Sequence, residues 1–200
     1  MATTLTYRPS RRHFLTVSTA AIGGVGLVTT AIPFMASMSP SERARAAGAP
    51  VEADIASIRP GALVTVEWRG RPVWILHRTE QQIASLGGHD AELVDPGSRV
   101  RQQPAYTANP TRSLKPEFLV LTAICTHLGC IPSYRPEPGA ADLGDDWPGG
   151  FYCPCHGSKF DLAGRVFRNV PAPTNMEVPP HSFRGAGTLL IGVDPDDALP

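Results

Sequence analysis

Two short stretches, C-T-H-L-G-C at 125–130 and C-P-C-H-G-S at 153–158, constrain this chain more than any other feature. Together they contain all four cysteines and two of the six histidines in a chain of 200 residues. Each stretch supplies one Cys followed closely by one His: Cys125 and His127 in the first, Cys153 and His156 in the second. This duplication predicts a site built by two loops that face each other.

Three kinds of site are compatible with these residues. A zinc site can use Cys and His, but C-x-H combined with C-x-x-H fits poorly the C-x(2–4)-C pairs of structural zinc sites. Two structural disulfides would suit an even count of cysteines in an exported chain, but they leave the repeated Cys–His order unexplained. The third is a Rieske cluster, a [2Fe-2S] unit in which two Cys bind one iron and two His bind the other.

The two stretches resemble the cluster-binding motifs of the Rieske iron-sulfur subunit of the bacterial cytochrome bc complex. The similarity extends over most of the chain, from an N-terminal twin-arginine anchor to a Pro-rich loop after the second motif. It implies one [2Fe-2S] cluster with four ligands: Cys125, His127, Cys153 and His156. It also implies a disulfide between Cys130 and Cys155, a pair that soluble Rieske ferredoxins and ring-hydroxylating oxygenases generally lack.

The ligand types of such a cluster explain its chemistry. Two thiolates and two neutral imidazoles leave the oxidised cluster near neutral, so it accepts an electron more readily than a cluster with four thiolates. A histidine ligand also keeps a second ring nitrogen that can carry a proton. The site is therefore expected to take an electron and a proton together.

The resemblance also assigns roles beside the ligands. Family members place a hydroxyl at the position of Ser158, where it donates to a bridging sulfide and raises the reduction potential. Phe160 stands where many quinol-oxidising members have Tyr, whose hydroxyl donates to a ligand sulfur, so a lower potential is expected here. Leu128 is expected to cover the cluster or to pack at the quinone-site surface. Residues 170–173 resemble the Pro loop that forms a third wall around the cluster.

Composition and the N-terminus indicate the class and compartment of the protein. The 18 basic and 18 acidic residues balance, so nothing in the net charge indicates nucleic-acid binding. Gly and Pro, 19 and 21 residues, favour a loop-rich β fold. Residues 10–15 read S-R-R-H-F-L, which is typical of a twin-arginine export signal, and a persistent disulfide needs an oxidising compartment.

An uncharged stretch follows the two arginines. As a helix, Phe14 to Met38 would be about 38 Å long, more than the roughly 30 Å hydrocarbon core of a membrane. This length favours a retained anchor over a secretory signal, although Ala44-Arg45-Ala46 leaves cleavage open. The expected organisation is a cytoplasmic twin-arginine segment (1–13), a transmembrane anchor (14–38), a flexible linker (39–50) and a periplasmic Rieske domain (51–200) whose cluster-binding part is about 123–173.

The remaining pattern predicts a mainly β fold: an N-terminal transmembrane helix plus an antiparallel β head domain with a cluster-binding subdomain. The expected elements are a hairpin of 63–68 and 73–77 that turns on Gly70, a short helix at 80–86, loop as far as Pro116, a strand at 118–123, an exposed loop at 131–152, a strand that Phe151 and Tyr152 start and that leads into the second motif, and a strand at 189–193.

The resemblance implies the iron-sulfur subunit of a bacterial ubiquinol-cytochrome c reductase in the inner membrane. In that role His156 accepts a hydrogen bond and then a proton from ubiquinol, and the electron passes to a c-type cytochrome. Cytochrome b and the c-type cytochrome would be partners in a dimeric complex. The alternative is an exported Rieske electron-transfer subunit of another oxidoreductase, such as arsenite oxidase.

Overall fold

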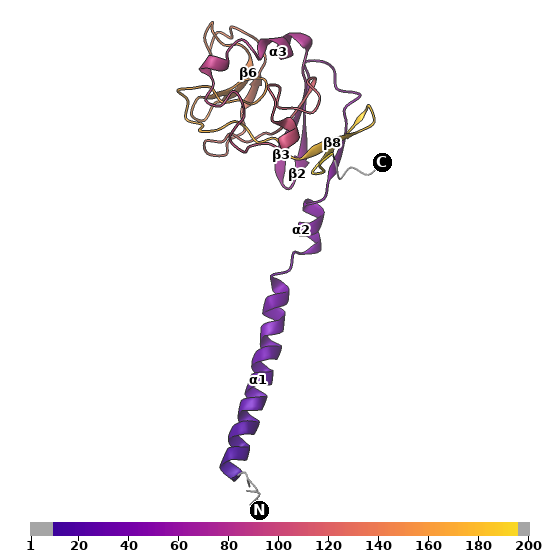
Figure 1. The fold of residues 1–200 in the computed structure, drawn as a ribbon, viewed down its shortest axis with the longest axis vertical. Coiled ribbons are helices and arrows are strands. Elements are labelled where there is room, and N and C mark those ends of the chain that lie inside the picture. The colour runs from indigo at the N-terminus through magenta and orange to yellow at the C-terminus, as the bar shows by residue number, and fades with distance from the viewer. Residues whose placement is uncertain (1–9, 196–200) are drawn as a thin grey trace, which may run out of the picture. The chain divides into compact units, whose positions relative to one another are not determined.

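The structure, a computed structural model, describes residues 10–195, so the first nine residues of the predicted cytoplasmic segment lie outside the described part. The chain divides into two compact units, residues 1–46 and residues 47–200. Figure 1 shows the helices and strands of both units.

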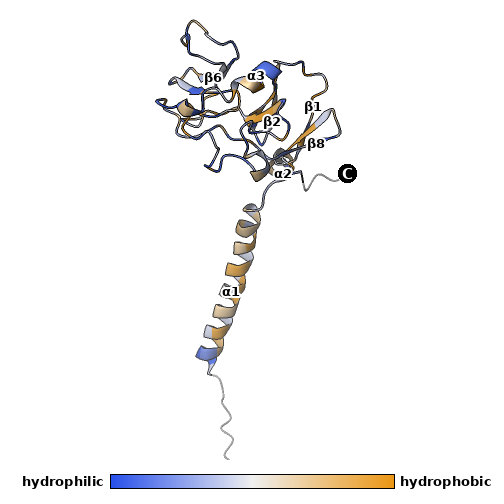
Figure 2. Ribbon diagram, turned by 45° about the horizontal axis from the view of Figure 1, so that its top comes forward, coloured by the Kyte–Doolittle hydropathy of each residue, from blue (hydrophilic) through white to orange (hydrophobic). Residues whose placement is uncertain are grey.

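The first unit contains one long helix, α1 (Arg11–Ser37), of 27 residues or about 40 Å. Ser10 caps its start, since the Ser10 hydroxyl accepts a hydrogen bond from the backbone N–H of His13 at 3.3 Å. Apolar residues run along most of its length, and the hydrophilic residues gather at its N-terminal end (Figure 2). The helix is long and apolar enough to cross a membrane, and none of its residues is buried within the protein.

The predicted linker at 39–50 contains a short helix, α2 (Glu42–Ala47). The hydroxyl of Ser41 accepts from the backbone N–H of Ala44 at 3.2 Å, and Glu42 pairs with Arg45 at 2.9 Å. Ala, Glu and Arg are strong helix formers, so local propensity and capping explain this short helix.

The second unit consists of three antiparallel sheets of three strands each, which confirms the predicted fold class. The first sheet has the order β1 (Val51–Asp54), β9 (Thr188–Ile191), β8 (His181–Arg184). The second has the order β2 (Leu63–Trp68), β3 (Arg71–His77), β4 (Phe118–Thr122). The third has the order β5 (Ser133–Arg135), β6 (Gly150–Cys153), β7 (Ser158–Phe160).

Within the sheet β2–β3–β4, the strands β3 and β4 are buried on both faces, whereas much of β2 is exposed. Alternate residues of β3 point to opposite sides, so Val73 and Ile75 join one apolar cluster with Leu189 and Ile191, whereas Trp74 joins the other. The Trp74 ring stacks on Phe151 of β6 with ring centroids 5.0 Å apart. The sheet β2–β3–β4 therefore packs against the sheet β5–β6–β7 through a continuous apolar core.

Local signals account for the hairpin and for the next helix. The β2–β3 turn is tighter than predicted, because Arg69 (φ 53°) and Gly70 (φ 70°) alone form it and strand pairing resumes at Arg71. The helix α3 (Glu80–Ser85) begins with a capping box between Thr79 and Gln82. Two 3-10 turns, η1 (Asp90–Glu92) and η2 (Ala105–Thr107), interrupt the predicted loop before Pro116.

The prediction of an exposed loop at 131–152 is wrong in part. The strand predicted from Phe151 is present as β6, but residues 133–135 also form a strand, β5, which pairs with it. Trp147 is 3% exposed and donates its indole N–H to the Arg135 carbonyl at 3.1 Å. Arg135 in turn pairs with Asp142 across the exposed side of the loop at 2.6 Å. A Trp surrounded by Pro, Gly and Asp offers no periodic pattern, so its burial could not be predicted locally.

Candidate metal centre

Both cysteine-histidine motifs adjoin strands of the third sheet, and the first comes from β4 of the second sheet. Residues 125–130 connect β4 to β5, and residues 153–158 connect β6 to β7. Each motif closes on its first cysteine, because Gly129 N–H donates to the Cys125 carbonyl at 3.0 Å and Gly157 N–H donates to the Cys153 carbonyl at 2.9 Å. Both glycines have positive φ, 85° and 80°, which the tight turns require.

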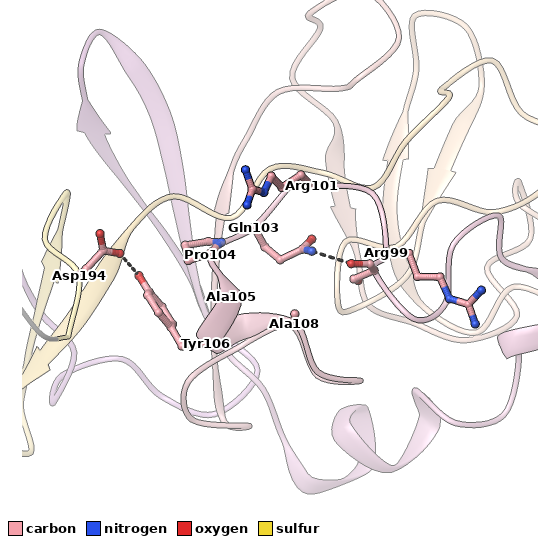
Figure 3. A pocket seen from close by; sticks show the side chains of 9 residues that line it. Arg99, Arg101, Gln103, Pro104, Ala105, Tyr106, Ala108 and Asp194 are labelled. Atoms are coloured by element: carbon pink, nitrogen blue, oxygen red, sulfur yellow. Dashed lines mark hydrogen bonds between the residues drawn. The ribbon is translucent and has the colours of Figure 1, made fainter.

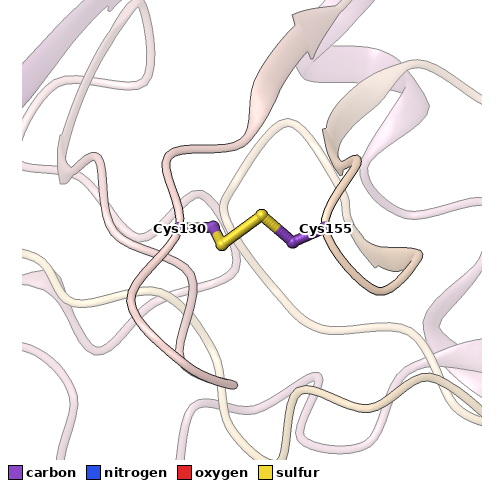
Figure 4. The surroundings of a disulfide bond; sticks show 2 residues. All are labelled: Cys130 and Cys155. Atoms are coloured by element: carbon purple, nitrogen blue, oxygen red, sulfur yellow. A yellow bond between two sulfur atoms is a disulfide. The ribbon is translucent and has the colours of Figure 1, made fainter.

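A disulfide joins the two motifs. Cys130 and Cys155 are bonded across the gap between the loops (Figure 4), which confirms the predicted pairing. Cys125 and Cys153 are free and buried. The sulfurs of Cys130, Cys153 and Cys155 lie within 4.8 Å of one another, but two of them are already bonded, so only Cys153 of this trio can supply a thiolate.

The two free thiols are neighbours. Burial raises the pKa of the Cys153 thiol, and the adjacent Cys125 side chain raises that pKa further. Two thiolates this close would repel each other unless a cation lay between them. Iron is such a cation, and it binds thiolate after displacing the proton.

The two histidines of the motifs face each other. Their rings lie 4.7 Å apart, centroid to centroid, at an angle of 89°. The His127 Nδ1 atom is buried and has no hydrogen-bond partner, whereas His156 is exposed. A buried ring nitrogen without a partner is costly unless something binds it. Two thiols, two imidazoles and this unpartnered nitrogen form a donor set that fits a Rieske-type [2Fe-2S] cluster.

The Pro segment at 170–173 is tied to both motifs. Ser158 Oγ accepts from the Ala172 N–H at 3.1 Å, and Thr126 Oγ1 donates to the Thr174 carbonyl at 2.7 Å. Because Ser158 is the acceptor in this bond, its own hydroxyl hydrogen is left to donate elsewhere. Thr126 was not singled out in the sequence, although its place between two candidate ligands was the signal that could have indicated it.

Of the other residues singled out in the sequence, Phe160 is buried in the core and Leu128 is exposed. Phe160 is fully buried in the apolar cluster that contains Cys125 and Cys153. Leu128 and Ile131 are 71% and 56% exposed, so apolar surface accompanies the exposed His156 at this end of the unit. Exposed apolar side chains of this size are typical of contact surfaces.

A surface pocket of about 720 Å³ lies among other residues, including Arg99, Arg101 and Asp194 (Figure 3). Its side chains already serve the fold: the Tyr106 hydroxyl donates to Asp194 at 2.7 Å, and the Gln103 amide donates to the Ser98 carbonyl at 2.7 Å. No residue of either motif lines this pocket. The candidate metal centre is therefore not in this pocket.

Comparisons with known proteins agree with this centre. A family profile described as "Rieske [2Fe-2S] domain" matches residues 50–180, and one described as "Ubiquitinol-cytochrome C reductase Fe-S subunit TAT signal" matches residues 1–41. The chain is 60% identical over 184 residues to the "Ubiquinol-cytochrome c reductase iron-sulfur subunit" of Allochromatium vinosum, covering 92% of this chain and 89% of the relative. It is 43% identical over 194 residues to the subunit of the same name from Blastochloris viridis, covering 96% and 98%. Among solved structures, a chain of "Hyperthermophilic respiratory Complex III" matches with a TM-score of 0.46 and 25% identity, over 86% of this chain and 98% of that chain.

Proposed function

This chain belongs to the Rieske [2Fe-2S] domain family, and on that premise we propose that it is the iron-sulfur subunit of a bacterial ubiquinol-cytochrome c reductase. The relatives named as that subunit match along nearly their whole length, and the profile at residues 1–41 carries the same name. A separate exported Rieske carrier, such as a subunit of arsenite oxidase, is disfavoured by these matches.

One observation supports the proposed ligand set above all. Two free buried thiols and two facing imidazoles meet between loops that a disulfide joins, and His127 Nδ1 has no protein partner. Cys125 and Cys153 would hold one iron, and His127 and His156 the other. In this donor set the cluster supplies a one-electron acceptor of high potential.

His156 is the proposed contact with ubiquinol. It is the more exposed of the two histidines, and two apolar side chains, Leu128 in the first motif and Ile131 directly after it, are exposed. Its ring nitrogen that faces solvent would accept the hydrogen bond of the quinol hydroxyl and then hold the proton as general base. Leu128 and Ile131 would exclude water around that hydrogen bond, and Ser158 would donate its free hydroxyl hydrogen towards the cluster.

The proposed setting is the inner membrane. α1 would anchor the chain within the predicted span 14–38, residues 39–50 would link it to the head, and residues 51–200 would lie in the periplasm with the cluster-binding part at about 123–173. Cytochrome b and a c-type cytochrome would be the partners, in a dimeric complex, and the c-type cytochrome would receive the electron.

Electron paramagnetic resonance of reduced membranes tests this function. Membranes from cells that express the full chain with its partner subunits should show a Rieske signal, and a quinone-site inhibitor should change the shape of that signal. A signal that is indifferent to the inhibitor would move the chain to a separate electron-transfer system. Absence of any iron signal would refute the cluster itself.

A matched pair of substitutions tests the ligand set. His127→Gln should abolish the signal, because one ring nitrogen bound to iron is lost. His77→Gln is the control, since the His77 ring nitrogen Nδ1 lies 2.6 Å from the Ile58 carbonyl, outside both motifs, and the signal should persist. Retention of the full signal in His127→Gln would show that the ligand set is wrong.

A further inference from the structure

Three buried guanidinium groups meet at one short turn of the chain. The turn is residues 161–165, which directly follow β7 and the second cysteine-histidine motif. Arg78, Arg112 and Arg165 are 2%, 0% and 1% exposed, and they are among the largest fully buried side chains of the described residues. Burial of three cations is costly unless each is hydrogen-bonded, so their placement needs an explanation.

Each of the three arginines binds a different part of the turn. Arg78 Nη1 donates to the Leu162 carbonyl at 3.0 Å. Arg112 Nη1 donates to the carbonyls of Ala163 and Gly164, at 3.0 and 3.2 Å. Arg165 Nε donates to the Asp161 carboxylate at 2.7 Å. Further hydrogen bonds join these guanidiniums to groups on distant segments, at Thr111, Ser113, Pro116, Gln103, Met176, Leu86, Asp90 and Pro96. Among their nitrogens, Arg112 Nε is buried without a hydrogen-bond partner.

These groups are charged at neutral pH. Burial lowers the pKa of Arg78 and of Arg112 to about 10, which is still well above neutrality. Burial alone would raise the pKa of Asp161, but hydrogen bonds and charge from His89 and Arg165 outweigh it and hold that pKa below its ordinary value.

The buried charges do not cancel. Asp161 is the one fully buried carboxylate among the described residues, so the fully buried groups carry three positive charges and one negative, an excess of two. The part-buried carboxylates of Asp95 and Glu117, which act on Arg112 and Arg78, offset part of this excess. His89, which lies 3.3 Å from Asp161, cannot reduce this excess, because an imidazole is neutral or positive. Asp90 pairs with Arg165 at 2.9 Å, but its carboxylate is half-exposed and solvent weakens its field.

The excess charge lies beside the candidate metal centre. Phe160 directly precedes Asp161 and is buried in the same apolar cluster as Cys125 and Cys153. Ser158 pairs with Cys153 in the sheet, and Asp161 is three positions after Ser158, so the backbone of Asp161 lies at most about 16 Å from that of Cys153. Little solvent lies in this core to weaken the field.

We propose that Arg78, Arg112 and Arg165, gathered on the turn at 161–165, raise the electron affinity of the cluster by placing excess positive charge behind it. They act as positioning and tuning residues and need no contact with the cluster. The reduced cluster carries one more negative charge than the oxidised one, so buried positive charge favours reduction. This charge would offset the hydrogen bond that Phe160 cannot supply. The inference rests on the proposed function, because it requires the [2Fe-2S] cluster.

Redox titration of the cluster signal tests this inference, in membranes that contain the full chain and its partners. Arg78→Gln keeps an amide donor for the Leu162 carbonyl but removes one positive charge, and Asp161→Asn removes the one negative charge. The equilibrium constant for reduction should fall about tenfold in the first variant and rise about tenfold in the second, a shift of about 59 mV in each direction. Arg78→Lys keeps the charge and should stay near the unmodified potential.

Potential shifts of opposite sign in Arg78→Gln and Asp161→Asn would be an effect of charge, because damage to the fold would not depend on the sign of the charge removed. Arg168→Gln is the matched control. This arginine is three residues from Arg165 but exposed, so solvent screens its charge and the reduction potential of the cluster should not change in this variant. The shifts in Arg78→Gln and Asp161→Asn should also persist at high salt. Asp90→Asn alters a surface carboxylate, leaves the buried groups in place, and should raise the potential slightly.

Each remaining outcome has a distinct meaning. If the signal shape is retained and the two variants shift in the same direction, or not at all, the inference is overturned. If Arg78→Gln and Asp161→Asn both lose the cluster, the potential of Asp90→Asn at low ionic strength, where screening is weakest, decides: a raised potential supports the inference and an unchanged one overturns it. If the unmodified chain shows no cluster signal, the proposed function is refuted. This outcome differs from failure of the inference, in which the unmodified chain does show the signal.

Discussion

Ser158 Oγ accepts a hydrogen bond from the backbone N–H of Ala172 at 3.1 Å, and this bond joins the second cysteine-histidine motif to the Pro segment. Both residues are buried. The bond orients the hydroxyl, so its hydrogen points away from Ala172 and can be donated to a sulfide of the cluster. In the proposed site, Ser158 would therefore both hold the Pro segment in place and donate a hydrogen bond that raises the reduction potential of the cluster.

Ser158→Ala should lower the reduction potential of the cluster. Loss of one charge-assisted hydrogen bond of about 1.4 kcal/mol corresponds to about 60 mV in a one-electron couple. Redox titration by electron paramagnetic resonance measures this shift, and Ser133→Ala on the exposed edge of β5 is a matched control. An unchanged potential in Ser158→Ala would show that its hydroxyl does not reach the cluster.

Phe160→Tyr should raise the reduction potential, by about 60 mV on the same reasoning. The ring is already buried in the apolar cluster that contains Cys125 and Cys153, so an added hydroxyl enters the surroundings of the ligand sulfurs. Phe118→Tyr places the same group in the other apolar cluster, with Leu189 and Ile191, and is the control. An unchanged or lowered potential in Phe160→Tyr, with the signal shape retained, would contradict the prediction.

Removal of the disulfide should make the cluster easier to lose on heating. The Cys130–Cys155 bond closes a loop of 25 residues, for which chain entropy predicts a loss of about 3 kcal/mol on removal. The double variant Cys130→Ser, Cys155→Ser replaces both sulfurs without leaving a free thiol. The temperature at which the cluster absorbance disappears should fall, and equal thermal stability in the two proteins would refute a stabilising role.

His181 should make the head less stable on acidification. Burial lowers the pKa of His181 below its ordinary value of 6.5, and its ring nitrogen Nδ1 lies 2.9 Å from the Pro179 carbonyl. The unfolded chain therefore binds the proton more readily than the folded one. The stability contribution is complete above pH 6.5 and declines, by at most about 1.4 kcal/mol per pH unit, as pH falls from 6.5 towards the lowered value.

Thermal unfolding at several pH values, in one redox state, measures this effect. The His181→Gln variant should lack the part of the slope between neutral and mildly acidic pH, whereas the exposed substitution Arg168→Gln should keep it. Identical pH slopes in His181→Gln and in the unmodified protein would assign the acid sensitivity to another group.

Local features of the chain were predicted well. The fold class and the Cys130–Cys155 pairing are confirmed, and the β2–β3 hairpin and α3 lie close to their predicted positions. These features depend on residues near one another in the chain: alternation, a tight glycine turn and a capping box. The motif resemblance added the ligand set, which remains a prediction.

The sequence alone thus determined the candidate donor atoms, the apolar N-terminal span and the main strands, because short-range patterns encode them. Only the tertiary structure decided that Trp147 is buried, that β1 pairs with β9, and that Arg78 reaches a carbonyl 84 residues away. An arginine has the same local pattern whether it is exposed or buried. Its burial depends on which distant carbonyls surround it, and the packing of the whole head determines those neighbours.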